Sequence, residues 1–328
     1  LNHCAEECVN ASQADLVTVA DSTIQTYGSG VTVDYATSVV LERNEVHGRD
    51  IEESAPGIRV WYSGSVDVEE NLVHGAFSDG ITIAEVWHTP TVRDNVVENS
   101  GTALTVHTNG QVNIALLSGN HGTGNTHGVF ELTGYVVTDM NLPLEGSFPV
   151  EIGQFGDLAI TTGHTLTIAP GTVVKSHNGG RLLVYGSLVA DGTAAEPIVF
   201  TDWRDDSAGG DSNGDGNTPV PEGVPWSCGC WKGIEGREDS SVTLDHASVR
   251  FALVGVESWR GATVSVMHSE LVHCGQSCVD MVGVSRVTVT DSIVSPEATD
   301  WSFEPTAGIT VHAAGSVDLQ RNVIQGGP

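Results

Sequence analysis

Residues 209–222, GGDSNGDGNTPVPE, combine the residue types and the spacing that bind calcium. They fit the pattern D-x-[DN]-x-[DN]-G-x₅-E of a calcium-binding loop. Calcium takes about six to eight oxygen ligands, which carboxylate and amide side chains supply. The expected ligands are the side chains of Asp211, Asn213 and Asp215, the carbonyl oxygen of Asn217 and the side chain of Glu222, with Asp205 and Asp206 as further candidates.

The sequence on either side of this loop indicates what a bound ion would do. The flanks VFTDW (199–203) and PWSCGCWKGI (225–234) are typical of strands, so the helix pair of a calcium sensor is excluded. A loop rich in Asp and Gly could also be merely solvated. We interpret the spacing as a structural calcium site that orders an inserted loop, expected to span residues 202–231.

A second group of residues suggests chemistry on carbohydrates. Two carboxylates at a suitable separation hydrolyse a glycosidic bond, and an arginine can act as the base of an elimination. The candidates for such a groove are Asp34, Arg59, Glu85 and His107. Exposed aromatic rings could instead stack on sugars without any reaction. The candidates for such a strip are Tyr35, Trp61, Tyr62 and Trp87. Since outward-facing polar rows are common in folds of this kind, we weigh a structural or adhesive role above an enzyme.

Some histidines also recur at matching places. His47 and His74 end the segments NEVHG and NLVHG in neighbouring repeats, and His273 occupies a related place. Stacked imidazoles could bind a transition metal. We favour the alternative, in which they form a ladder at a turn.

Six cysteines occur as three local pairs: Cys4/Cys8, Cys228/Cys230 and Cys274/Cys278. An even count in an acidic chain suggests disulfides and an oxidising compartment, and the lack of a C-x₂-C pair argues against zinc. Cys4–Cys8 and Cys274–Cys278 could each close a small loop. Alternatively, Cys228 or Cys230 pairs with Cys274 or Cys278, since a Cys228–Cys230 ring would be strained.

The charge of the chain restricts its partners. The 328 residues include 42 Asp or Glu and only 13 Lys or Arg, which gives a formal net charge of −29. Nucleic acids and anionic membranes need basic surface, so they are excluded as partners. No window of about 18 apolar residues exists, so no membrane insertion is expected. The chain begins at Leu1 without a signal peptide, so we expect a mature product or part of a longer protein.

Short repeated strands must position all of these residues. GVTVDYATSVVLERNEVHG (30–48) aligns with GIRVWYSGSVDVEENLVHG (57–75), and 80–101 and 101–120 continue the series. Related strands return at 241–249, 262–271, 286–294 and 316–324. A period of about 22–27 residues with about three short strands indicates a solenoid. Because the leucine and helix pattern of leucine-rich repeats is missing, the remaining choice is an all-β parallel β-helix.

Alternation within the strands separates core from surface. The predicted inward pairs are Val31/Val33, Ile58/Val60, Ile81/Ile83 and Leu104/Val106. One outward row is Thr32, Arg59, Thr82 and Thr105, and the next is Asp34, Trp61, Ala84 and His107. A turn position recurs as Asn44, Asn71 and Asn95, and later as Ala247, Ser269, Ser292 and Asn322. We expect the amides to form a ladder that bonds backbone of their own or the next coil.

Residues 139–160 interrupt the pattern. The strands that follow are separated by different turn residues, in LTIAPGTVVK, LVADGTAAEPIVFT and, after the Asp/Gly-rich loop, WKGI. The stretch 163–234 resembles a motif of large secreted or surface-attached bacterial proteins with right-handed parallel β-helix repeats. The resemblance implies a right-handed β-helix, an extracellular setting and a new stack of coils. It implies little chemistry. The acid-pair and metal motifs of hydrolases and lyases in the wider pectate-lyase-like superfamily are not found here.

We therefore predict two contiguous β-helix stacks, at residues 1–140 and 141–328. The expected protein is secreted or on the cell surface, is stabilised by Ca²⁺, and serves as a stalk, fibre or assembly subunit that could bind glycan. The expected partners are flanking repeats or a second copy of the chain, stacked end to end through open strand edges, and a cell-surface glycan. The alternative is a polysaccharide lyase or glycoside hydrolase.

Overall fold

The computed structural model describes residues 2–49, 55–75, 77–113, 116–142, 148–153, 156–177, 179–216, 231–296 and 307–325, and throughout these ranges the chain is built from strands and turns without an α-helix. None of the described residues forms a helix of the length and apolar character needed to cross a membrane. The fold is a right-handed parallel β-helix, as the sequence predicts. It comprises two compact units. The first contains Leu1–Tyr135, Leu144–Val150 and Ser212–Gly214; the second contains Val136–Pro143, Glu151–Asp211 and Asp215–Pro328.

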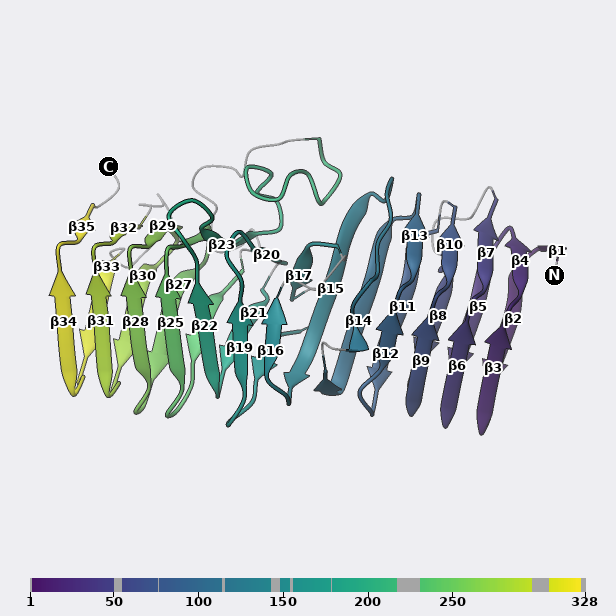
Figure 1. Ribbon diagram of the computed structural model, residues 1–328, viewed down its shortest axis with the longest axis horizontal. Helices are drawn as coiled ribbons and strands as arrows, with labels where there is room; N and C mark the ends of the chain where they lie inside the picture. The colour runs from purple at the N-terminus through teal and green to yellow at the C-terminus, as the bar shows by residue number, and fades with distance from the viewer. Residues whose placement is uncertain are drawn as a thin grey trace. The chain divides into compact units, whose positions relative to one another are not determined.

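In the first unit, each coil contributes one strand to each of three parallel sheets (Figure 1). One sheet contains β2 (Glu7–Ser12), β5 (Ser29–Asp34), β8 (Ile58–Trp61), β11 (Asp79–Val86) and β14 (Thr102–Val112), followed by β15 (His127–Val136). The second contains β3 (Leu16–Ala20), β6 (Ser38–Glu42), β9 (Ser65–Glu69) and β12 (Thr91–Arg93). The third contains β1 (Asn2–Cys4), β4 (Thr23–Thr26), β7 (Glu45–Gly48), β10 (Leu72–His74) and β13 (Val96–Glu98).

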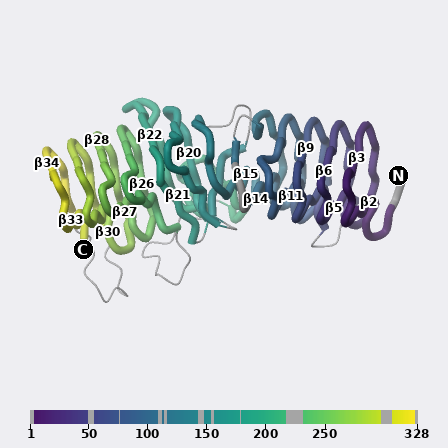
Figure 2. Tube along the Cα trace, turned by 90° about the horizontal axis from the view of Figure 1, so that it is seen from below, coloured from purple at the N-terminus to yellow at the C-terminus, as the bar shows by residue number. Residues whose placement is uncertain are grey.

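The second unit repeats this plan, and its coils are stacked one after another (Figure 2). One sheet contains β18 (Leu158–Ile160), β21 (Arg181–Val184), β24 (Gly233–Gly236), β27 (Val254–Trp259), β30 (Ser277–Val282) and β33 (Ala307–His312). The second contains β16 (Met140–Leu142), β19 (Thr165–Ile168), β22 (Ser187–Asp191), β25 (Ser241–Asp245), β28 (Thr263–Met267), β31 (Arg286–Thr290) and β34 (Ser316–Gln320). The third contains β20 (Val173–Ser176), β23 (Ile198–Asp202), β26 (Ala247–Arg250), β29 (Glu270–Cys274), β32 (Ile293–Pro296) and β35 (Val323–Ile324), and β17 (Val150–Ile152) lies at the division between the units.

Alternation along the strands builds the core. The inward pairs predicted for β5, β8, β11 and β14 are all between 0% and 1% exposed. Their strands are aligned in register, so Val31 lies beside Ile58 and Ile58 beside Ile81. Branched side chains therefore stack on like side chains through the interior, which favours the pleated strand. A glycine precedes the inward pair in β5, β8 and β11 and is required by close approach: a Cβ on Gly57 would lie 2.7 Å from the carbonyl oxygen of Gly80.

The predicted asparagine ladder is present at the turn between the second and third sheets. The Oδ1 atom of each asparagine accepts a hydrogen bond from the backbone N–H of the ladder residue one coil earlier: Asn44 donates to Asn71 at 3.0 Å, and Asn71 donates to Asn95 at 3.0 Å. Each Nδ2 atom donates backward, as from Asn71 to the Leu41 carbonyl at 2.8 Å. The structure adds Asn120, whose Oδ1 atom accepts from Asn95.

Shorter side chains continue the ladder in the second unit. The N–H of Ala247 donates to Ser269 Oγ at 3.0 Å, Ser269 donates to Ser292 Oγ at 3.1 Å, and Ser292 donates to Asn322 Oδ1 at 3.0 Å. These residues occupy the predicted places. A serine accepts the forward hydrogen bond but has no amide for the backward one, so this ladder holds fewer bonds per coil.

Two disulfides close short turns between neighbouring strands. Cys4 is joined to Cys8, and Cys274 is joined to Cys278. Both Cys274 and Cys278 are 0% exposed, so this disulfide is part of the core. The first of the two pairing schemes left open by the sequence is the one found for these four residues. Cys228 and Cys230 lie outside the described residues.

Candidate functional site

The predicted aromatic strip lies on the first unit, at the ends of β5, β8 and β11. The Tyr35 and Tyr62 rings stack with their centroids 5.0 Å apart and their planes 8° apart. The Trp61 ring meets Tyr62 edge-on at 6.1 Å, and the Arg59 guanidinium lies 5.2 Å from the Trp61 ring centroid. Tyr35, Trp61 and Trp87 are 54%, 38% and 59% exposed. The strip therefore presents ring faces and edges to solvent.

The backbone fixes the position of the two tyrosines. Tyr35 and Tyr62 have φ values of 58° and 49°, in the left-handed region. The N–H of Tyr35 donates to the Trp61 carbonyl and that of Tyr62 to the Ala84 carbonyl, each in the following coil. A left-handed conformation costs a residue with a Cβ on the order of 1 kcal/mol, and a stacked aromatic pair returns about as much. The ring pair is thus held at a fixed turn.

The predicted acid–base residues form two separate pairs instead of one cluster. Arg59 Nη2 lies 3.3 Å from Asp34 Oδ2, and His107 Nε2 lies 3.3 Å from Glu85 Oε1. His107 Nδ1 also lies 2.5 Å from the hydroxyl of Thr133. Both predicted outward rows are in register across the strands. The row that contains Thr32 and Thr105 is less exposed than predicted, since these two residues are only 1% and 3% exposed.

A buried carboxyl that the sequence did not single out lies beside this row. Glu131 in β15 is 4% exposed and accepts a hydrogen bond from the Thr105 hydroxyl at 3.0 Å. Burial raises the pKa of Glu131 to about 7, although the bond from Thr105 lowers it. Its enclosure makes it a structural group of the sheet rather than one that can reach a ligand.

In the Asp/Gly-rich loop, two of the predicted calcium ligands converge with a third carboxylate. Asp206, Asp211 and Asp215 each offer an oxygen within 4.8 Å of the others. The N–H of Gly216 donates to Asp211 Oδ2 at 3.0 Å and closes the turn. Asn213 is 6% exposed. Asn217 and Glu222 are not among the described residues, so their predicted part in the site is untested.

Asp206 has the environment of a cation ligand. Both of its carboxylate oxygens are sealed from solvent and have no hydrogen-bond partner among the described residues. Burial, followed by the nearby charges of Asp215 and Asp211, raises the pKa of Asp206. A buried carboxylate without a partner is costly, and a divalent ion would satisfy these oxygens and relieve the repulsion among the three acids.

The neighbouring groups have other partners. Asp205 accepts from the Thr201 hydroxyl at 2.6 Å and pairs with Arg250 Nε at 2.8 Å, so it is held within the fold. Burial raises the pKa of Asp205, but hydrogen bonds from Ser207 and Thr201 and the charge of Arg250 bring it below its usual value. Lys175 is 0% exposed and donates to the Gly210 carbonyl at 2.8 Å. One ammonium does not neutralise the acids around it.

A row of acids on the second unit was missed by the sequence analysis. Glu235 in β24, Glu257 in β27 and Asp280 in β30 lie in register on successive strands, facing away from the core. The neighbouring residues Ile234, Val256 and Val279 point inward at 0% exposure. The signal in the sequence is an acid directly after the inward residue, in GIEG, GVESW and CVDM.

Two arginines fix the first of these acids. Arg181 Nη1 lies 2.8 Å from Glu235 Oε2, and Arg237 also pairs with Glu235, whose side chain is 2% exposed. Burial, and then the charge of Glu235 and a hydrogen bond with it, raise the pKa of Glu257 to about 7, with Asp280 adding to the effect. The row thus holds an acid paired with two arginines next to an acid whose pKa is raised to about 7.

Aromatic rings border this row. The Arg237 guanidinium lies 5.1 Å from the Trp259 ring centroid and 6.0 Å from that of Tyr185. Cation–π contact of this kind orients the guanidinium toward Glu235. An acid with a raised pKa, two further acids and ring faces are therefore gathered on one sheet of the second unit.

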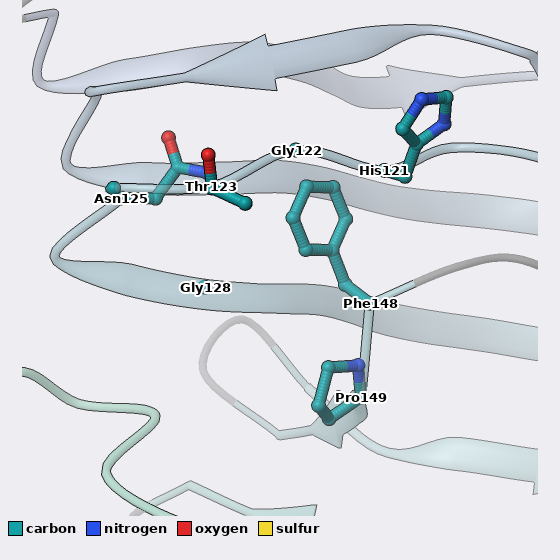
Figure 3. A pocket seen from close by; sticks show the side chains of 8 residues that line it. His121, Gly122, Thr123, Asn125, Gly128, Phe148 and Pro149 are labelled. Carbon is teal, nitrogen blue, oxygen red and sulfur yellow. The ribbon is translucent and has the colours of Figure 1, made fainter.

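The hollow in Figure 3 carries no comparable chemistry. It has a volume of about 260 Å³, is open to solvent, and lies in the first unit beside Phe148 and Pro149, facing the backbone from His121 to Asn125. The imidazole that lines it belongs to His121, whose Nδ1 atom is already 2.9 Å from the Gly119 carbonyl. We assign no function to it.

Comparison with known proteins agrees with this architecture. Residues 1–138 match the family model described as the right handed beta helix region. Comparisons with curated proteins and with solved structures found no match. The match covers 138 of the 328 residues, so it supports the fold and does not define the function. The chemistry must be argued from the sites themselves.

Proposed function

We propose that this chain is a secreted or cell-surface β-helix that binds glycan through the strip formed by Tyr35, Trp61, Tyr62 and Trp87. The observation that carries the proposal is the stacked tyrosine pair with the exposed Trp61 beside it, and Trp87 is exposed after the next strand, β11. Rings that are held apart from the core and open to solvent suit the apolar faces of sugar rings. The two disulfides support an oxidising, extracytoplasmic setting. The net charge of −29 favours neutral over acidic glycans.

Calcium is part of the same proposal. Asp206, Asp211 and Asp215 would bind one Ca²⁺ through their carboxylate oxygens, and the ion would hold the loop on the coils. Asp206, a further candidate from the sequence, would act together with the expected ligands Asp211 and Asp215. No helix pair flanks the loop in the described residues, so the ion would act as a structural support.

The last described coil supports the proposed end-to-end stacking. Val317, Leu319 and Ile324 are 49%, 44% and 54% exposed, although Val317 and Leu319 pair in register with the buried Val287 and Val289. Exposed apolar side chains at core positions suit contact with another coil, from a flanking repeat or a second copy. Light scattering that finds only monomer at high concentration, with calcium present, would argue against the second copy.

Binding to a glycan array tests the main proposal. Trp61→Ala and Tyr62→Asn should each weaken binding of a neutral oligosaccharide about tenfold, because each removes a stacking surface. Asparagine is chosen at position 62 because it tolerates the left-handed backbone. Tyr135→Ala is the control, since Tyr135 is 49% exposed on the same unit but outside the strip. Equal loss in the control, or no binding by the unaltered chain, would contradict the proposal.

A second function, hydrolysis of a glycan, is favoured by the acid row of the second unit. Glu257 would donate a proton to the leaving oxygen, and Asp280 on the next strand would act as nucleophile or base. Neighbouring strands lie about 4.8 Å apart, close to the separation of about 5 Å in retaining glycosidases. Glu235, held by Arg181 and Arg237, would keep Glu257 protonated.

This candidate predicts that a polysaccharide panel yields a cleaved substrate and that cleavage falls as the pH rises through about 7, where Glu257 loses its proton. Glu257→Gln and Asp280→Asn should each abolish it. Glu131→Gln is the matched control, because Glu131 is also a buried acid with a pKa of about 7 but lies in the first unit. If no polysaccharide in the panel is cleaved, the hydrolase candidate is rejected and only the glycan-binding proposal remains.

A further inference from the structure

A column of turn residues runs along the second unit where the strands of its second sheet end. His246, His268, Asp291 and Arg321 follow β25, β28, β31 and β34, and all have φ values between 45° and 52°. The N–H of His246 donates to the Met267 carbonyl, and that of His268 to the Thr290 carbonyl, each in the next coil. The shared backbone conformation sets these side chains one above another.

Two imidazoles in this column converge on one carboxylate. Asp245 Oδ1 lies 2.8 Å from His246 Nδ1 and 2.9 Å from His268 Nδ1. The two rings stack with centroids 4.8 Å apart and planes 20° apart. The three ligand atoms lie within 4.8 Å of one another, and the side chains of Asp245, His246 and His268 are 23%, 30% and 49% exposed. An ion can therefore reach them from solvent.

The far side of His268 faces a second carboxylate. Its Nε2 atom lies 4.0 Å from Asp291 Oδ2. Arg321 holds Asp291 through two hydrogen bonds of 2.6 Å. Histidines that bind metal usually direct their second nitrogen at a carboxylate, which orients the ring and raises its basicity.

The histidine pair of the first unit lacks this arrangement. His47 and His74 also stand in neighbouring coils, but their rings are 6.2 Å apart and tilted by 58°. His47 pairs with Glu45 at 3.6 Å and His74 pairs with Glu98 at 3.3 Å, so the two rings share no acid in these contacts. Stacking in consecutive coils alone therefore does not produce a three-ligand set.

We propose that Asp245, His246 and His268 bind one borderline divalent transition-metal ion, of the class of Zn²⁺, Co²⁺ or Ni²⁺, with water at the remaining positions. Imidazole nitrogen with a single carboxylate suits these ions and not calcium, which prefers oxygen ligands alone. The ion would replace the Nδ1 protons of both rings and join two successive coils. The site is independent of the Asp206 loop and of the proposed glycan strip.

Calorimetry with ZnCl₂ on the whole chain tests the site at pH 7.5, with the loop first saturated with Ca²⁺. The unaltered chain should bind one Zn²⁺ that His246→Asn and His268→Asn each abolish. Asparagine tolerates the left-handed turn, and a thermal melt without metal establishes that each variant is folded. Asp291→Asn should weaken Zn²⁺ binding about tenfold, because it removes the carboxylate behind His268.

The control is His74→Asn, which should leave Zn²⁺ binding unchanged. Co²⁺ provides a second measurement on the unaltered chain, since imidazole ligation gives visible absorption bands that excess Zn²⁺ should remove. No Zn²⁺ binding by the unaltered chain, undiminished binding in a folded His268→Asn variant, or loss in His74→Asn equal to that in His268→Asn would each overturn the assignment.

Discussion

Replacing Asn71 by alanine should lower the free energy of unfolding by about 3 kcal/mol, because several buried groups lose their partners at once. Asn71 is 1% exposed. Its Oδ1 atom accepts from both the backbone and the side chain of Asn44 at 3.0 Å. Its Nδ2 atom donates to the Leu41 carbonyl at 2.8 Å and to Asn95 Oδ1 at 3.0 Å. Water cannot replace these bonds without opening the turn.

Denaturant unfolding followed by circular dichroism measures this effect. Asn71→Ser should be destabilised less than Asn71→Ala, since a serine hydroxyl accepts the forward bond in the second unit. Asn10→Ala is the control, because Asn10 is exposed on β2, and its loss should cost less than about 0.5 kcal/mol. An Asn71→Ala variant as stable as the control would show that the ladder does not stabilise the fold.

Removal of calcium should lower the melting temperature of the chain. A ligand at about 100 times its dissociation constant stabilises the folded state by about 2.7 kcal/mol, and that contribution disappears when EDTA removes the ion. The physical reason is the convergence of Asp206, Asp211 and Asp215. Burial, and then the charges of Asp215 and Asp211, raise the pKa of Asp206. Differential scanning calorimetry with EDTA and then with excess Ca²⁺ measures the shift and its reversal.

Variants distinguish this site from a general effect of divalent ions on an acidic chain. Asp206→Asn and Asp211→Asn should melt at the same temperature with and without Ca²⁺. Asp191→Asn removes an exposed acid from the same unit and should keep the full calcium response. The calcium site is rejected if EDTA leaves the melting temperature of the unaltered chain unchanged.

The fold was readable from the sequence because the repeats carry two signals that agree. Alternation placed Val31, Ile58 and Ile81 in the core, where they are between 0% and 1% exposed. The recurrent asparagine marked the same turn in each coil, so strand order and register followed together. Both signals are local and repeat in every coil. They can therefore be recognised in the sequence without any knowledge of long-range contacts.

The candidate sites were only partly readable, because their contacts cross coils that differ in length. Asp211 and Asp215 were found from their spacing, whereas Asp206 was one of two further candidates, and the path of the loop brings it to them. Arg181 and Glu235 are 54 residues apart in sequence and 2.8 Å apart in space, since the Asp/Gly-rich insertion separates two adjacent strands. The four residues predicted to line one groove, Asp34, Arg59, Glu85 and His107, form two local ion pairs that spacing alone does not show.

The turn residues that follow the strands recur at a regular spacing from coil to coil. The left-handed position after each strand accepts residues as different as Tyr35, Arg43, Glu70 and His246. None of these four is among the buried residues of the core. Successive positions are separated by the strand spacing of about 4.8 Å. A polymeric ligand whose repeating unit matches that spacing would meet an equivalent group at every step, so its affinity would grow with its length.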